Sequence, residues 1–447
     1  MIDKAREVAL KVLYKIDKDN AYSNIALDEE LGKNKKSLNE KDIGLISEIV
    51  YGTTTWRLTI DEIIKKYSKI KIKKISTWIL NILRMGIYQI VFLDKIPKSA
   101  SVNESVNLAK RYGHKSSSNF VNAILRKIEK EDLKDFNNIE NNIEKISKTT
   151  SMPEWIVKEL LHEFSEEDVK NICINSNIKP KISIRINKLK TSKKELLKTL
   201  KEKNIEVEEG ILEDFLVLNK VKNIENMSEF KNGLFTIQDE AAGLIPLILS
   251  PKQNEKVLDA CSSPGGKTTY IAEIMQNNGQ IDAWDIHKHR VKLVENAKNR
   301  LGINIINEKV NNAELYNEEY KEKYDKILLD VPCMGIGVIK RKPDIKWQRK
   351  KEDIAQITKT QKNILQTCSK YIKTGGSIVY STCSILKQEN ENIIKDFIKS
   401  NTNFVIEEIE SLPNSFFNKY IKENKYICVQ PNKITDGFFI CKLCKKF

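Results

Sequence analysis

The first part of the chain repeats apolar side chains at the spacing of a helix. One stripe consists of Ala5, Ala9, Val12 and Ile16, and others follow at 45–50, 60–67, 102–109 and 120–128. Residues three or four apart share one face of an α-helix, so each stripe predicts a helix with one buried face. The most apolar stretch, 75–93, also contains Asn81 and Arg84, which favours a buried central helix over a membrane span. The pattern predicts an all-α domain over residues 1–135.

The period of the pattern changes after a polar, Asn-rich stretch at 136–150. Lys181-Ile-Ser-Ile-Arg-Ile186 alternates apolar and polar side chains, as a half-buried β-strand does. A helix is predicted at 191–203, and short strands are predicted at 205–207 and 215–218. We therefore expect a linker and a small α+β unit over residues 136–233.

From residue 234 to residue 447, short apolar runs alternate with helical stretches. The runs predict strands at 257–260, 280–286, 324–331 and 377–381, with helices at 268–275, 287–301 and 351–372 between them. Strands separated by helices in this way form a parallel, doubly wound sheet. A last hairpin is predicted from 426–429 and 437–443. The expected fold is multidomain, with an all-α domain, a small α+β unit and a C-terminal α/β Rossmann-like domain.

The chain carries a strong positive charge. It has 76 Lys and Arg residues against 61 Asp and Glu residues, a formal net charge of +15. Within residues 1–135 there are 26 basic and 18 acidic residues, so about half of the excess lies in the helical domain. A basic balance favours a polyanionic partner such as RNA. The alternative is a solvated, lysine-rich face without a binding role.

Eight cysteines are scattered along the chain, and residues 1–20 are charged and amphipathic, unlike a secretory leader. We therefore expect a cytoplasmic protein with reduced thiols. Cys441 and Cys444 form a single C-x-x-C pair, and no second pair completes a zinc site. No metal is expected.

The candidate chemistry starts at Asp259-Ala-Cys-Ser-Ser-Pro-Gly-Gly-Lys-Thr268, a turn between a predicted strand and a predicted helix. Gly265 and Gly266 let backbone N–H groups approach a ligand, and the helix start adds partial positive charge. Asp285 ends the next strand, where an acid can hold a ribose diol. The glycines do not match a dinucleotide motif, and Cys261 stands where a P-loop has its first glycine. A nucleoside cofactor without phosphates is predicted, and S-adenosylmethionine is the candidate.

Two cysteines follow predicted strands at the same edge of the sheet. Cys333 ends the run Leu329-Asp-Val-Pro-Cys333, and Cys383 lies in Tyr380-Ser-Thr-Cys-Ser384. A single buried cysteine is usually a small, inert apolar side chain. Two thiols that converge on a cofactor site instead indicate nucleophilic catalysis by a thiolate.

These motifs together resemble a known family. The cofactor turn, Asp330-Val-Pro-Cys333 and Ser381-Thr-Cys-Ser384 are similar to the signature of the RNA 5-methylcytosine methyltransferases, whose two-cysteine pattern is highly specific. Residues 1–130 resemble the antitermination factor NusB. Phe235–Ala242 and Ser183–Asn187 resemble segments of the RsmB/Sun family, the cytosine methyltransferases of 16S small-subunit ribosomal RNA. The resemblance covers essentially the whole chain.

The resemblance implies roles for individual residues. Cys383 would attack carbon 6 of cytosine, which makes carbon 5 nucleophilic enough to accept a methyl group. Cys333 would help to remove the proton or to release the product. Asp330 would hydrogen-bond the cytosine ring, and Lys267 would reach the same site. The target base must be turned out of a helix or already be single-stranded.

The resemblance also implies a class I, S-adenosylmethionine-dependent methyltransferase domain over residues 234–447. The residues expected to bind the cofactor are Cys261, Ser262, Ser263, Pro264, Gly265, Gly266, Lys267, Asp285, Asn312 and Asp330. Asn312 is a departure, because the family usually has an acid there, near the adenine amino group. Its side-chain oxygen can still accept a hydrogen bond, so we expect binding to survive.

We expect a monomer whose partner is small-subunit ribosomal RNA, with no membrane association. The basic segment Arg341–Trp347, just after Cys333, is expected to touch RNA phosphates; an ordinary solvated turn is the alternative. Two other functions stay open. Transfer RNA is the alternative substrate, and a non-catalytic, NusB-like assembly factor is the alternative class. The intact pair of Cys333 and Cys383 argues against the second.

Overall fold

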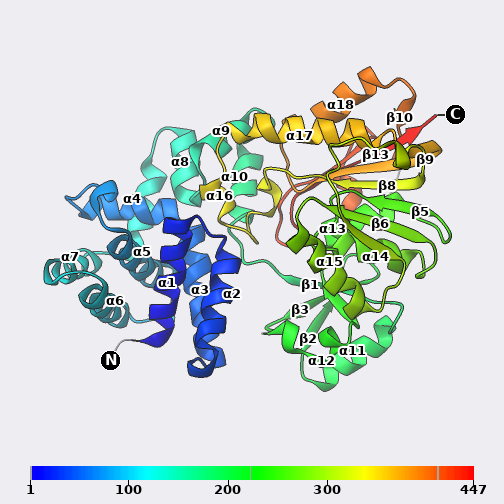
Figure 1. Ribbon diagram of the computed structural model, residues 1–447. Helices are drawn as coiled ribbons and strands as arrows, with labels where there is room; N and C mark the ends of the chain where they lie inside the picture. Colours follow the sequence, from blue (N-terminus) through cyan, green and yellow to red (C-terminus); the bar gives the residue numbers. More distant parts are fainter. Residues whose placement is uncertain (1–2, 222, 410–411, 447) are drawn as a thin grey trace. The chain divides into compact units, whose positions relative to one another are not determined.

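The computed structural model describes residues 3–221, 223–409 and 412–446. Contacts within the chain divide it into two compact units (Figure 1). The first unit runs to Asn177 and also takes in Ile339–Lys351, and the second comprises Ile178–Val338 and Glu352–Phe447. The domain boundaries expected after residues 135 and 233 remain predictions.

The first unit is helical, as the apolar stripes predict. Its longer helices are α1 (Lys4–Asp19), α2 (Ser23–Asn34), α3 (Glu40–Thr55), α4 (Arg57–Tyr67), α5 (Thr77–Phe92), α6 (Lys98–Tyr112), α7 (Lys115–Leu125), α8 (Asn142–Thr150), α9 (Glu154–Leu161) and α10 (Glu166–Asn175). Short 3-10 helices are η1 (Lys35–Ser37), η2 (Ile72–Lys74) and η3 (Lys130–Asn138). Among the helices in the described ranges, none is both long enough and apolar enough to cross a membrane.

Helix α5 is the centre of this unit, and every residue from Ile79 to Val91 on it is buried. Arg84 is among them, and it forms ion pairs with Asp61 of α4 (2.7 Å) and Asp17 of α1 (2.5 Å). A buried charge is tolerated when it is paired and hydrogen-bonded. The arginine therefore ties three helices together, which explains a cation in the most apolar stretch of the sequence.

Ile339–Lys351 joins the helical unit although it comes from the second half of the chain. Its helix α16 (Ile345–Gln348) lies beside α8 and α10 (Figure 1). The Nζ atom of Lys346 donates hydrogen bonds to the carbonyls of Thr55 (3.2 Å) and Ser151 (3.1 Å) and to the side-chain oxygen of Asn177 (2.6 Å). One buried amine thus connects three separate parts of the unit.

The expectation that Arg341–Trp347 touches RNA phosphates is wrong for the centre of this segment. Asp344 and Lys346 are each only 1% exposed. The carboxylate of Asp344 accepts hydrogen bonds from the backbone N–H (3.1 Å) and the hydroxyl (2.7 Å) of Ser23. The charges anchor the segment inside the helical unit instead of facing a ligand.

The second unit begins with a small antiparallel sheet in the order β2-β3-β1-β4. Its strands are β1 (Ile182–Ile186), β2 (Glu206–Glu209), β3 (Phe215–Asn219) and β4 (Phe235–Ile237), with helices α11 (Lys193–Glu202), η4 (Ile224–Asn226) and α12 (Ser228–Lys231). Ile184 and Ile186 on one face of β1 share a core with Leu196 and Leu200 of α11. The predicted α+β unit is confirmed.

The rest of the second unit is built on a large mixed sheet in the order β11-β12-β13-β9-β8-β5-β6-β7, with β10 beside β13. Its strands are β5 (Lys256–Asp259), β6 (Gln280–Asp285), β7 (Ile306–Val310), β8 (Tyr324–Asp330), β9 (Ile372–Thr382), β10 (Phe404–Ile406), β11 (Ile421–Lys422), β12 (Tyr426–Val429) and β13 (Phe438–Lys445). Strands β5 to β9 pair in parallel, and β13 pairs antiparallel to β9 and to β12. The predicted final hairpin is therefore confirmed.

Helices cover both faces of this sheet, as a doubly wound fold requires. They are α13 (Glu240–Leu249), α14 (Gly266–Ile274), α15 (Lys288–Leu301), α17 (Asp353–Cys368) and α18 (Glu391–Ser400), with short 3-10 helices η5 (Glu318–Tyr320), η6 (Ile336–Val338), η7 (Lys387–Glu389) and η8 (Ser415–Tyr420). Leu328 of β8 packs in the core shared with α13 to α15, whereas Ile327 and Leu329 pack with α17 and α18. The continuous apolar run of β8 follows from burial on both faces.

A pH dependence follows from the buried amine of the inserted segment. Burial lowers the pKa of Lys346 to about 7 from 10.5. Between these values the unfolded chain holds a proton that the folded unit releases, so this group makes stability rise with pH over that window. We expect the free energy of unfolding of the wild type, relative to Lys346→Met, to increase between about pH 7 and about pH 9.

Urea unfolding followed by tryptophan fluorescence measures this difference, because Trp56, Trp78, Trp155 and Trp347 all belong to the helical unit. Lys71→Met, at an exposed lysine of the same unit, serves as the control and is expected to show no such change. If the difference in free energy of unfolding between the wild type and Lys346→Met stays constant over this pH range, the three acceptors of Lys346 keep its ammonium form in the folded unit.

Candidate active site

The turn after β5 forms an open cradle of backbone groups. Gly265 has a φ of +102°, which residues with a side chain rarely adopt, and a Cβ there would lie 3.2 Å from the Cα of Val294 on α15. A Cβ on Gly266 would stand 3.8 Å from its nearest neighbour, Gln238. Gly266 begins α14, whose first N–H groups are left without partners within the helix. The turn therefore suits a small polar ligand.

Polar side chains lie at the ends of the next two strands. Asp285 ends β6, and its carboxylate accepts a hydrogen bond from the backbone N–H of His287 (3.0 Å). Ile286 beside it is 52% exposed and offers an apolar surface for a ring. After β7, Asn312 accepts the N–H of Glu314 (3.0 Å) through its side-chain oxygen, which keeps a second lone pair for a ligand. An acceptor for a diol, an apolar surface and the glycine turn together fit S-adenosylmethionine.

Not every residue of the turn offers its side chain to a ligand. The hydroxyl of Ser262 donates to the carbonyl of Trp284 (3.0 Å), and the residue is buried. Cys261 packs against the apolar core below the sheet, and burial raises the pKa of its thiol. The backbone N–H of Ser262 also donates to the carbonyl of Trp284 (2.8 Å). Neither side chain is therefore offered to a ligand, and Cys261 is an inert thiol.

The two predicted cysteine loops meet beyond the ends of β8 and β9. The strands pair in parallel, with Asp330 opposite Ser381, so the residues that follow leave the sheet side by side. The Sγ atoms of Cys333 and Cys383 lie 2.9 Å apart, and both residues are half-buried. Its hydrogen bond with Cys383, together with burial, raises the pKa of Cys333 well above its usual range. Cys333 therefore remains a protonated thiol.

Close backbone packing holds the second cysteine. The N–H of Gly337 donates to the carbonyl of Cys383 (2.9 Å), and the N–H of Gly437 donates to the carbonyl of Gly337 (2.8 Å). A Cβ on Gly337 would lie 2.2 Å from the carbonyl oxygen of Gly437. Only glycine fits there, and it lets the loop after Cys333 pack against the backbone of Cys383 and hydrogen-bond to it.

Lys267 and Asp330 form an ion pair at the same edge of the sheet. The Nζ atom of Lys267 lies 2.7 Å from one carboxylate oxygen, and the other accepts the hydroxyl of Ser381 (2.9 Å). Burial acts to lower the pKa of Lys267, but attraction to Asp330 outweighs it, and Cys383 adds to that attraction, so the pKa is raised. The site thus holds a fixed cation close enough to stabilise negative charge at Cys383.

Glu389 is a site residue that the sequence did not single out. It is fully buried, and its carboxylate accepts the N–H of Met334 (2.8 Å), next to Cys333, and the hydroxyl of Ser384, next to Cys383. The side chain of Gln361 also donates to it (3.1 Å). Glu389 ends the short helix η7, two residues before α18 starts at Glu391. The carboxylate holds the two thiol loops together.

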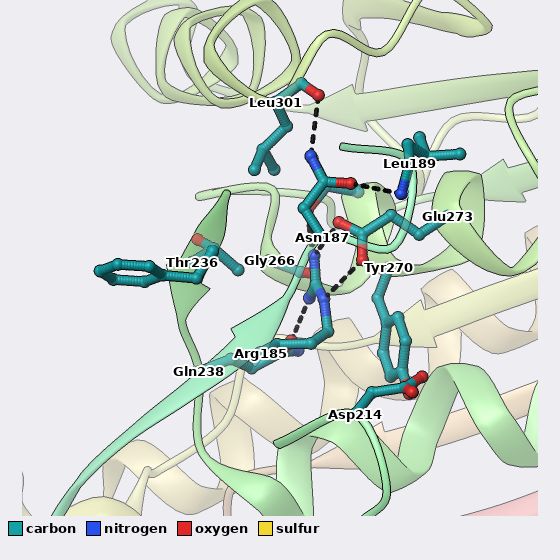
Figure 2. Close-up of polar contacts among 12 residues, drawn as sticks. Arg185, Asn187, Leu189, Asp214, Thr236, Gln238, Gly266, Tyr270, Glu273 and Leu301 are labelled. Atoms are coloured by element: carbon teal, nitrogen blue, oxygen red, sulfur yellow. Dashed lines mark hydrogen bonds and ion pairs between the residues drawn. The ribbon is translucent and has the colours of Figure 1, made fainter. Parts of the chain in front are cut away.

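Arg185 on β1 is the second residue that the sequence missed (Figure 2). Its guanidinium donates to both carboxylate oxygens of Glu273 (3.1 and 2.8 Å), to the hydroxyl of Thr269 (3.1 Å), to the carbonyl of Gly266 (2.8 Å) and to the side chain of Gln238. Alternation along β1 suggests a solvent-facing side chain, yet Arg185 is fully buried because α14 covers that face. The small sheet is thereby bonded to the first turn of the cofactor helix.

Comparison with known proteins gives matches to three protein families. Residues 246–444 match the family described as 16S rRNA methyltransferase RsmB/F, and residues 3–130 match the NusB family. Residues 152–225 match the ferredoxin-like domain of RsmF/B-like methyltransferases. Together the matches extend over most of the chain and fall on its helical part, its small sheet and its large sheet.

Individual relatives match over the whole length. The chain is 38% identical over 443 residues to a Bacillus subtilis (strain 168) protein named probable ribosomal RNA small subunit methyltransferase B, covering 99% of this chain and 98% of the relative. Ribosomal RNA small subunit methyltransferase B of Shewanella oneidensis is 31% identical, with 88% and 89% covered. The crystal structure of PH0851 matches over 100% of both chains, with a TM-score of 0.83 and 25% identity.

A structure of NSun6 from Pyrococcus horikoshii with SFG shares the fold, with a TM-score of 0.58 at 23% identity. The match covers 66% of this chain and 98% of the NSun6 chain.

Loss of the buried guanidinium will destabilise the second unit. Arg185→Met leaves the carboxylate of Glu273 buried and unpaired, so we expect it to lower the free energy of unfolding by about 3–5 kcal/mol. Chemical denaturation followed by circular dichroism measures the change. The double variant Arg185→Met with Glu273→Leu removes both charges and should recover most of the loss. A wild-type midpoint for the single variant would contradict the assignment.

Proposed function

The chain belongs to the family of ribosomal RNA small subunit methyltransferase B, and from that premise we propose that it methylates carbon 5 of a cytosine in 16S ribosomal RNA. The methyl donor is S-adenosylmethionine. The observation that carries the proposal is the pair of thiols, Cys333 and Cys383, 2.9 Å apart beside the ion pair of Lys267 and Asp330. Methyl transfer to oxygen or to an exocyclic nitrogen would need neither thiol.

In the first step the thiol of Cys383 gives up its proton to solvent, and its sulfur bonds to carbon 6 of cytosine. The electron pair of the 5,6 double bond moves into the ring and makes carbon 5 nucleophilic. Asp330 would hydrogen-bond the ring edge, and the raised pKa of Lys267 keeps a proton on the amine next to it. The pair would thus balance the negative charge that the attack brings into the ring.

Methyl transfer and release follow at carbon 5. When bound, S-adenosylmethionine supplies the methyl group as an electrophile. The proton on carbon 5 then leaves, the bond between Cys383 and carbon 6 breaks, and the aromatic ring is restored. The largest cause of the raised pKa of Cys333 is its interaction with Cys383. That cause disappears when Cys383 is bonded to carbon, so the pKa of Cys333 would fall and its thiol would more readily form the thiolate that can accept the proton from carbon 5.

The cofactor would lie along the edge of the sheet from the glycine turn to Asn312. The backbone of residues 261–266 would contact its methionine end, Asp285 its ribose, and Asn312 its adenine amino group. Lys267 and Asp330 would then lie between the donor and the acceptor base, and Pro264 and Ser263 complete the turn.

Removal of the nucleophile gives the sharpest test. Cys383→Ala should reduce methyl transfer by about a thousandfold or more, whereas Cys333→Ser should form a covalent adduct with RNA that it cannot release. The activity of Cys383→Ala is measured by transfer of labelled methyl groups to a small-subunit rRNA transcript. The adduct of Cys333→Ser is detected as a gel shift that survives denaturant. Bisulfite sequencing locates the product.

Cys444→Ser, at a half-buried thiol of β13, is the matched control and should keep wild-type activity. Normal methylation by Cys383→Ala would refute the covalent mechanism. Methylated cytosine in transfer RNA but not in 16S RNA would refute the substrate.

The ribose contact can be tested without the reaction. Asp285→Ala should raise the dissociation constant for S-adenosylmethionine about tenfold to a hundredfold, since a hydrogen bond to a charged group is lost. Isothermal titration calorimetry measures it, and Asp396→Ala, at an exposed acid of α18, should bind as the wild type does. An unchanged constant for Asp285→Ala would remove this residue from the cofactor site.

A further inference from the structure

A groove of about 1020 Å³ lies in the helical unit, and none of its lining residues has been assigned above to catalysis. Its walls come from α4, η2, the start of α9 and the inserted segment 339–351. Seven of the lining side chains are basic, one of them the buried Lys346, and only two are acidic. This volume is at the upper end for a small-molecule pocket, and the excess of positive charge suits an extended polyanion.

The two acids of the groove are already neutralised. The carboxylate of Asp61 receives two hydrogen bonds of 2.7 Å from the buried Arg84. Glu62 lies 2.5 Å from Lys65 and 3.4 Å from Lys148. Neither acid is left to repel an anionic ligand.

Three lysines of the groove are unpaired. Lys71, Lys73 and Lys74, in and beside η2, are exposed, and within the described parts of the chain no carboxylate lies within ion-pair distance of them. Like charges this close together repel one another, and a phosphate backbone that binds them would relieve the repulsion and release counterions.

Two tryptophans give the groove an aromatic surface. The indole N–H of Trp347 donates to the carbonyl of Thr54 (2.7 Å), which fixes its ring, and the guanidinium of Arg57 lies 5.5 Å from the ring centroid. Trp155, in the first turn of α9, is half-buried and lines the groove together with Pro153. Indole rings beside cations are the combination on which nucleic-acid bases stack while the phosphates are neutralised.

We propose that this groove binds a single-stranded segment of the RNA substrate. Lys71, Lys73 and Lys74 contact phosphates, and Trp155 stacks on a base. The proposal rests on the proposed function, since it takes RNA as the substrate.

The chain itself connects the groove to the candidate active site. Ile339, the first residue of the inserted segment, follows Cys333 by six positions. Trp347 and Arg349 of that segment line the groove. RNA bound there would contact a segment that begins six residues after one of the two thiols, and this gives a reason for anchoring the segment through Asp344 and Lys346.

The test measures RNA binding by the full chain. Lys71→Ala, Lys73→Ala and Lys74→Ala are combined in one variant, and the dissociation constant for a small-subunit rRNA transcript is measured by filter binding over a range of salt. We expect binding at least about tenfold weaker at low salt, and a slope of log affinity against log salt reduced by about 2, as for three lost phosphate contacts on a single strand. Trp155→Ala should weaken binding about tenfold without changing that slope.

The matched control is a triple alanine variant at Lys35, Lys36 and Lys41. These lysines are exposed, belong to the same unit and lie outside the groove, so this variant loses the same net charge. Circular dichroism and the affinity for S-adenosylmethionine, which should match the wild type in all three variants, exclude misfolding. Wild-type RNA affinity and slope in the groove variant would overturn the proposal. Equal losses in the control would also overturn it, because they would reflect net charge alone. Binding of an acidic protein, and not of RNA, in the groove would overturn it as well.

Kinetics separate this proposal from the function on which it rests. In the groove variant the KM for RNA should rise while kcat at saturating RNA stays within about twofold of the wild type. If the wild type does not methylate cytosine, the proposed function fails whatever the binding data show. If the variant methylates with an unchanged KM, the groove proposal fails and the function stands.

Discussion

The parallel pairing of β8 with β9 is the constraint on which the candidate active site depends. It sets Asp330 opposite Ser381, so that the loops carrying Cys333 and Cys383 leave the sheet next to each other. The two thiols are fifty positions apart in the chain, and a flexible loop of that length would leave their separation undefined. The strand register brings the loops together, and the buried carboxylate of Glu389 bonds to both and fixes the distance.

The small sheet serves the same site from outside it. It contributes none of the proposed catalytic groups, yet Arg185 on β1 bonds to the carbonyl of Gly266 and to α14, the helix that starts at the cofactor turn. Asn187 does the same for α15 through the carbonyl of Leu301 (2.9 Å). A binding site is held to the required geometry when residues behind it are themselves fixed. The α+β unit thus fixes the positions of α14 and α15, the two helices beside the cofactor turn.

The inserted segment shows that a basic composition does not by itself locate a nucleic-acid surface. Lys346 has the same side chain as Lys71, but it is buried, and its amine is directed at three oxygen atoms of the helical unit. The lysines around η2 are exposed and unpaired within the described residues, so their charge remains available to a ligand. Burial and ion pairing decide which basic side chains can bind RNA, and a count of basic residues reveals neither.

The sequence by itself determined the helical first part, the small sheet, the doubly wound sheet and the two cysteine motifs. Each of these depends on local periodicity or on turn chemistry, which neighbouring residues encode. Tertiary structure alone decided the roles of Arg185, Glu389 and Lys346. Each is a charged side chain that local pattern assigns to solvent, and each is buried because an element distant in the sequence covers it and supplies its partners. The sequence could therefore indicate that a cofactor turn and two thiols exist, but only the packed chain could establish what holds them 2.9 Å apart and which cations are left for a ligand.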